Sequence, residues 1–150
     1  MEVSSLQFDS VLVYRKHDLK ENWQEGLHDL EEIELNQEVY KNGPVFFSCT
    51  DDAYDRDKGA FTYYLPINQP VGVREDAEIQ YLEQVQIDKA LTLRQADQET
   101  NFSAAYEKVK KYAERENIAL SDTYYCVMLD VYGEIMIDLY VPLAERSEVS

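Results

Sequence analysis

Two segments far apart in the sequence alternate apolar and polar residues, and each is followed by apolar residues at helical spacing. In residues 8–15, Val11 and Val13 fall on one face of a strand and their neighbours on the other, and residues 85–94 show a comparable pattern. The helical positions are Leu19, Trp23, Leu27 and Leu30 in the first half, and Phe102, Tyr106, Val109 and Ala113 in the second. Each half therefore begins with a predicted strand and helix.

Two further strands are predicted after each helix. They are residues 45–50 and 60–67 in the first half, and residues 124–129 and 134–143 in the second. Residues 8–51 align with residues 87–130 without a gap, and residue character matches along most of this alignment. We interpret the chain as an internal repeat of a β-α-β-β unit.

These elements predict one domain over residues 1–150, since 150 residues suffice for a single core. Repeat one covers about residues 6–67, a connector about 68–83, and repeat two about 84–143. The predicted class is α+β, with two pseudo-symmetric repeats forming a mixed, mainly antiparallel sheet and both helices on one face. The opposite face of the sheet is then free to curve around a ligand.

The charge balance limits the partners. The chain has 30 acidic and 14 basic residues, and its net charge is −16. Direct nucleic-acid binding and docking on anionic membranes are both disfavoured, because both need clusters of Lys and Arg. The charge suits a cationic ligand, a basic protein partner, or solubility alone. The first residues lack the pattern of a signal peptide and no apolar run spans a bilayer, so a cytoplasmic protein is expected.

The duplicated unit, the pair Gly43-Pro44 after the first helix, and the stretch Asp-Leu-Tyr-Val-Pro-Leu at residues 138–143 resemble the GyrI-like, or bacterial effector-binding, domain superfamily. The resemblance covers nearly the whole chain. It implies a concave pocket between the two halves, and in several relatives an aromatic pocket with a buried glutamate binds lipophilic cations. Residues 123–128, in the strand where the family has that glutamate, contain none. The hydrolase activity of some relatives needs that glutamate, so we do not expect it here.

The last strand suggests where a ligand would bind. Ile135, Ile137, Leu139 and Val141 form an aliphatic face suited to packing under the helices, whereas the other face combines polar and aromatic residues. Aromatic rings attract cations and carboxylates supply the opposite charge, for which Asp138 and Glu134 are the candidates. The predicted ligand-binding residues are Tyr64, Tyr140, Asp138, Met136, Glu134, Tyr125 and Phe46. The alternative interpretation is an ordinary solvated sheet face.

No cofactor, metal site or catalytic set is predicted. The acidic loop at residues 51–59 lacks a full set of calcium ligands, and His17 and His28 form no zinc-binding pair. Cys49 and Cys126 are expected to be free, buried thiols. We therefore expect a ligand-binding protein and not an enzyme. The rival hypothesis is an acidic interaction module, an inhibitor or adaptor for a basic protein, and the sequence does not define an oligomeric state.

Overall fold

The computed structural model describes residues 2–37, 40–51, 54–55, 57–68, 79–95, 102–131 and 134–144. The first half contains β1 (Glu2–Leu19), the 3-10 turn η1 (Lys20–Asn22), α1 (Trp23–Gln37), β2 (Phe46–Asp51) and β3 (Lys58–Pro66). The second half contains β4 (Ile79–Gln95), α2 (Phe102–Arg115), β5 (Thr123–Val131) and β6 (Glu134–Pro142). The predicted order of two successive β-α-β-β segments is therefore observed. The predicted connector is too long, because β4 already begins at Ile79.

The strands form a closed sheet in the order β1-β3-β2-β5-β6-β4, in which β4 pairs again with β1. All pairings between neighbouring strands of the described residues are antiparallel. The predicted α+β class with a mainly antiparallel sheet is confirmed. Closure was not predicted, and it depends on β1 and β4 being much longer than residues 8–15 and 85–94.

β1 changes its pairing near Ser10. Before this residue it pairs with β4, whereas from Val11 onward it also pairs with β3. Ser10 has a φ of 54°, which is uncommon for a residue other than glycine, and its carbonyl accepts a hydrogen bond from the Ile67 amide at 2.8 Å. The bend lets one long strand serve both halves of the sheet.

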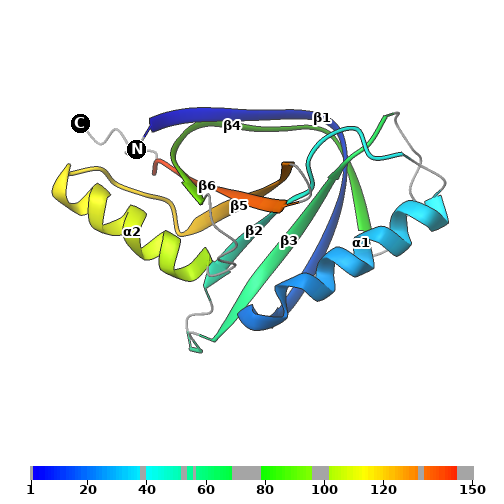
Figure 1. The fold of residues 1–150 in the computed structure, drawn as a ribbon, viewed down its shortest axis with the longest axis horizontal. Coiled ribbons are helices and arrows are strands. Elements are labelled where there is room, and N and C mark those ends of the chain that lie inside the picture. The colour runs from blue at the N-terminus through cyan, green and yellow to red at the C-terminus, as the bar shows by residue number, and fades with distance from the viewer. Residues whose placement is uncertain are drawn as a thin grey trace.

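Both helices cover one face of the sheet, which we call the outer face. α1 contacts β3 and β1, and α2 contacts β6 and β4. Figure 1 shows the two helices flanking the central strands, with β1 and β4 arching over the side that faces away from them. Aromatic pairs fix the helices to the outer face: Trp23 stacks on Phe47 at 5.5 Å between centroids, and Tyr106 lies 4.2 Å from Tyr124.

The other face, which we call the inner face, carries the side chains that alternate with those of the outer face. Val11, Val13 and Phe46 are completely buried there, and Val127 is nearly so. β1 and β4 enclose this surface because they complete the closed sheet. The inner face is therefore a second packed layer and not the solvated surface that was the alternative interpretation.

Candidate functional site

An aromatic cluster occupies the inner face of β2, β3 and β5. The ring of Phe46 lies between Phe8, at 4.8 Å, and Tyr64, at 4.5 Å with an interplanar angle of only 6°. Tyr125 completes the cluster, with its ring 6.1 Å from Tyr64 and 6.5 Å from Phe46. Phe46 has no exposed surface, so it supports the cluster, while the half-buried Tyr64 and Tyr125 present the accessible rings.

Tyr140 extends this cluster across the next strand. It lies directly opposite Tyr125 in the antiparallel pairing of β5 with β6, so both side chains share the inner face. Tyr64 of β3 lies opposite Phe46 of β2. Ser48 lies two residues after Phe46, on the same face of β2, and is opposite Tyr125 of β5. Strand register thus brings the four predicted aromatic residues onto one surface although they come from four strands.

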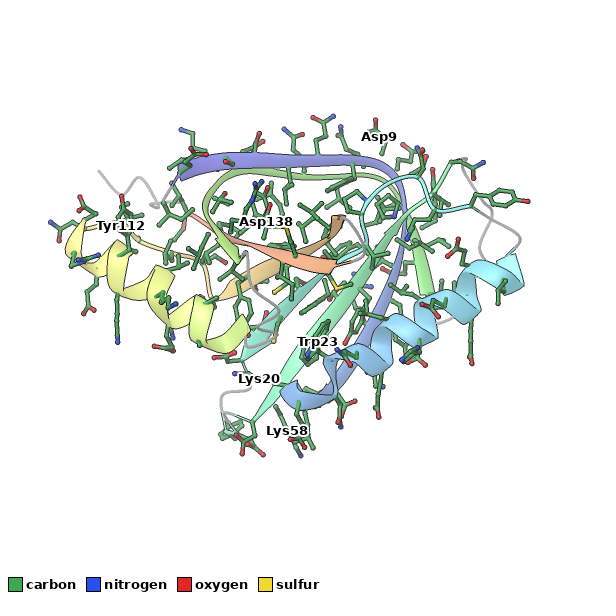
Figure 2. All side chains as sticks on the ribbon, viewed as in Figure 1. Asp9, Lys20, Trp23, Lys58, Tyr112 and Asp138 are labelled. Atoms are coloured by element: carbon green, nitrogen blue, oxygen red, sulfur yellow. The ribbon has the colours of Figure 1, made fainter. Side chains whose placement is uncertain are left out.

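Asp138 is the charged member of the inner face. Its side chain is only 6% exposed, and its Oδ1 accepts a hydrogen bond from Nε of Arg94 at 3.2 Å. Arg94 faces Asp138 across β4 and β6, but its own side chain is 66% exposed. Figure 2 shows Asp138 on the side of β6 that faces the arch of β1 and β4, whereas Trp23 lies beside α1 on the opposite side of the sheet. The Asp138 carboxylate is therefore buried, and the guanidinium group that pairs with it belongs to an exposed side chain.

The hydroxyl groups of Tyr125 and Tyr140 are neutral hydrogen-bonding groups at physiological pH. Burial, together with the neighbouring Tyr64, raises the pKa of Tyr125 to about 12. Burial and the nearby Asp138 carboxylate also raise the pKa of Tyr140. Opposite Tyr140, the Oγ1 atom of Thr92 is buried and has no hydrogen-bond partner among the described residues. The inner face therefore combines apolar rings with several polar atoms that a ligand can engage.

The last two predicted residues lie further along β6. Met136 is half-buried and pairs with Leu129 of β5. Glu134 is the first residue of β6 and pairs with Val131, but its side chain lies outside the described residues. Met136 follows the expected alternation onto the inner face, and the role of Glu134 stays a prediction.

A groove opens at one end of the inner face. Its volume is about 830 Å³, and Thr123, Tyr125 and Pro142 contribute the inner-face side of its wall. Ile87 of β4 and the segment after α2 that includes Ile118 form other parts of the wall. Tyr125 thus connects the aromatic cluster with a solvent-accessible opening.

Sequence reasoning did not find a second groove, which lies on the outer face beside α1. Its volume is about 680 Å³. It is lined by Trp23, Gln24, Leu27, His28, Leu30, Glu31, Glu34, Lys41, Pro44, Val45, Leu65, Met128 and Leu129. The helical spacing of Leu27, Glu31 and Glu34 was visible in the sequence. Their position beside Val45 and Met128 depends on the pairing of two distant segments, seen in the 3.1 Å bond from the Met128 amide to the Val45 carbonyl.

Other candidate chemistry has no supporting geometry in the described part of the chain. No group of three His, Cys, Asp or Glu side chains there could hold a metal ion. In the acidic loop, Asp51 pairs with Lys20 at 2.8 Å. Cys49 and Cys126 are free and buried as predicted, and burial raises the pKa of Cys49 to about 11. No described helix is both long and apolar enough to cross a membrane.

The closed sheet flanked by two helices is the fold of GyrI-like effector-binding domains. The C-terminal domain of EcmrR superposes with a TM-score of 0.67 at 13% identity, covering 95% of this chain and 97% of that domain. EcmrR in a complex with DNA superposes with a TM-score of 0.70 at 13% identity, and the match covers 95% of this chain and 57% of that chain. SAV2435 bound to tetraphenylphosphonium gives 0.57 at 11% identity, covering 97% and 95% of the two chains. A hydrolase from Listeria innocua gives 0.57 at 10% identity, covering 95% and 92%.

At such low sequence identity, these superpositions show a common fold and nothing more. By sequence, residues 8–146 match the family described as domain of unknown function DUF5085, and the chain belongs to this family. A sequence comparison with curated proteins found no match to the chain.

Proposed function

We propose that the chain is a binding module for a small amphipathic cation, which it holds on the inner face. The observation that carries the proposal is Asp138, a carboxylate buried on the same surface as Tyr64, Tyr125 and Tyr140. A buried carboxylate is costly unless a positive group compensates it. A ligand with a cationic centre and apolar substituents would match both the charge and the rings.

Each part of the site has a distinct role in this proposal. The rings of Tyr125 and Tyr140 supply apolar contact and cation–π attraction, which is worth about 0.5–2 kcal/mol for each well-placed ring. Asp138 selects for positive charge. The groove beside Tyr125 is the entrance, and Phe46 holds Tyr64 in place by stacking.

The related folds support binding of a small molecule more than any particular ligand. EcmrR, whose C-terminal domain shares the fold, is found in a complex with DNA, and SAV2435 carries tetraphenylphosphonium. A similar fold in a hydrolase does not extend to activity here, because residues 123–128 lack the glutamate that the enzymatic relatives are expected to use. We therefore propose binding without catalysis.

The test is isothermal titration calorimetry with tetraphenylphosphonium as the probe. We expect binding to the unmodified protein, at least a tenfold loss of affinity in Asp138→Asn, and a comparable loss in Tyr140→Ala. Asp9→Asn removes an exposed carboxylate of β1, and Tyr112→Ala removes a ring from α2, so they are the matched controls. Equal affinity in Asp138→Asn and Asp9→Asn, or no binding at all, would overturn the proposal.

A further inference from the structure

The outer groove beside α1 has an apolar floor that the fold leaves partly uncovered. Leu27, Val45 and Met128 line it, and each is only half-buried. These three side chains come from α1, from the residue that precedes β2, and from β5. Since buried apolar area stabilises association, a floor of this kind favours a partner that presents an apolar stripe.

The rim of the groove is acidic. Glu31 and Glu34 line it, and the side chain of Glu31 is 75% exposed. Within the described lining residues the only Lys or Arg is Lys41, whose backbone amide donates to Oε1 of Glu34 at 3.3 Å. α1 as a whole carries five carboxylates, at Glu25, Asp29, Glu31, Glu32 and Glu34, and neither Lys nor Arg. The rim therefore attracts positive charge.

The shape of the groove is elongated along the helix. Its lining runs from Trp23 to Glu34 of α1, which at 1.5 Å per residue is roughly 16 Å, or about three helical turns. Two large apolar side chains that follow Glu34 in the sequence are also exposed: Leu35 is 78% exposed and Tyr40 is 74% exposed. An open trough of this length suits an elongated partner better than a compact molecule.

We infer that this groove docks an amphipathic helix of a partner protein, with basic residues on both sides of its apolar stripe. Apolar side chains at i, i+3, i+4 and i+7 of that helix would reach the floor formed by Leu27, Val45 and Met128. Its Lys or Arg residues would lie against Glu31 and Glu34, which speeds association and fixes the orientation of the helix. This surface is on the opposite face of the sheet from Asp138, so the inference does not depend on the small-molecule site.

Fluorescence anisotropy with synthetic peptides tests the inference directly. The probe is a labelled 16-residue helix of Leu and Lys with one apolar stripe, and the comparison peptide has the same composition in a scrambled order. We expect the patterned peptide to bind at least tenfold more tightly than the scrambled one. In Glu31→Gln/Glu34→Gln its affinity should fall at least fivefold, and in Met128→Gln by a similar factor.

The control removes the same charge from the far side of the helix. Glu25→Gln/Glu32→Gln should leave the affinity within twofold, since neither residue lines the groove. Equal losses in the two double variants, or equal binding of the two peptides, would mean non-specific attraction to an acidic protein and would overturn the inference. Displacement of the peptide by tetraphenylphosphonium, undiminished in Asp138→Asn, would assign the groove to a small cation and would overturn it as well.

Discussion

Arg94 reaches Asp138 from the surface, so the buried carboxylate is neutralised by a side chain that is itself mostly in water. The contact joins Nε of Arg94 to Oδ1 of Asp138 at 3.2 Å across the pairing of β4 with β6. An exposed arginine can leave such a contact at a small cost, because its guanidinium is already hydrated. A cationic ligand that reaches Asp138 would therefore replace Arg94, which acts as a competitor attached to the chain.

The first prediction is that Arg94→Gln strengthens binding of tetraphenylphosphonium. Because Arg94 is mostly exposed, removing it should improve the binding free energy by about 1 kcal/mol, which is about fivefold in Kd. Calorimetric titration at pH 8 measures the change. Arg94→Lys keeps the positive charge and should stay within twofold of the unmodified protein.

Two outcomes separate this prediction from the proposed function. If the unmodified protein and Arg94→Gln bind the probe equally, Arg94 does not compete with the ligand. In that case the proposed replacement of Arg94 by the ligand is wrong, but the inner-face site is not. If neither protein binds the probe, the inner-face proposal fails.

The second prediction is that Gly26→Ala destabilises the fold. A methyl group at this position would overlap the ring of Tyr63, whose hydroxyl donates to the Trp23 carbonyl at 2.7 Å and fixes the ring. Overpacking of this kind lowers the free energy of unfolding by about 1–3 kcal/mol. Urea unfolding should show the loss, while Gln24→Ala on the exposed side of α1 should change stability by less than about 0.5 kcal/mol.

A double variant identifies the cause. In a Tyr63→Leu background the smaller side chain leaves space for the methyl group, so Gly26→Ala should cost much less there. An equal cost in both backgrounds would show that the ring is not what excludes a side chain at position 26.

Local patterns predicted most of the fold. Alternation placed Val11 and Val13 together on one face of their strand, and the structure shows that this is the inner face. Helical spacing placed Trp23 and Tyr106 on the apolar sides of their helices, which pack on the outer face. The same alternation in the last strand separated Leu139, which packs under the helices, from its polar and aromatic neighbours. Such patterns succeed because a strand or helix that is buried on one side must repeat that side in its sequence.

Long-range pairing explains what the sequence did not reveal. The first residues of β1 are mostly polar, and they pair with the second half of β4, from Gln86 to Thr92. The first residues of β4 pair instead with β1 between Asp9 and Tyr14, and this long-range pairing closes the sheet. Likewise, Asp138 was a candidate from its own strand, but its contact with Arg94 depends on the register of β4 against β6. No local spacing encodes a partner 44 residues away.

The third prediction concerns the two thiols. Burial raises the pKa of Cys49 to about 11 and raises that of Cys126 well above its usual value, so neither is a reactive thiolate at pH 8. We expect no alkylation of the native protein by iodoacetamide during a one-hour reaction, and labelling of both cysteines in 6 M guanidinium chloride. Mass spectrometry of peptides assigns the sites. Rapid labelling of Cys49 in the native protein would contradict its burial between β3 and β5.

The last prediction concerns acid stability and the end of β1. The carboxylate of Asp18 accepts hydrogen bonds from the Leu19 amide at 2.8 Å and from Asn22 Nδ2 at 3.3 Å, and Lys16 Nζ lies 3.3 Å away. The Leu19 bond, followed by those of Asn22 and Lys16, holds the pKa of Asp18 below its ordinary value of 3.8. The unfolded chain therefore binds the proton more tightly, and the stabilisation is complete above pH 3.8 and is lost as the pH falls through the folded-state value. Asp18→Asn should lower the free energy of unfolding at pH 7 by up to about 1 kcal/mol, the upper range for a partly exposed charged contact, and its urea midpoint should converge with that of the unmodified protein in acid. A constant difference between the two proteins from pH 7 to pH 2, with Asp9→Asn as the control, would show that the carboxylate of Asp18 does not contribute through its charge.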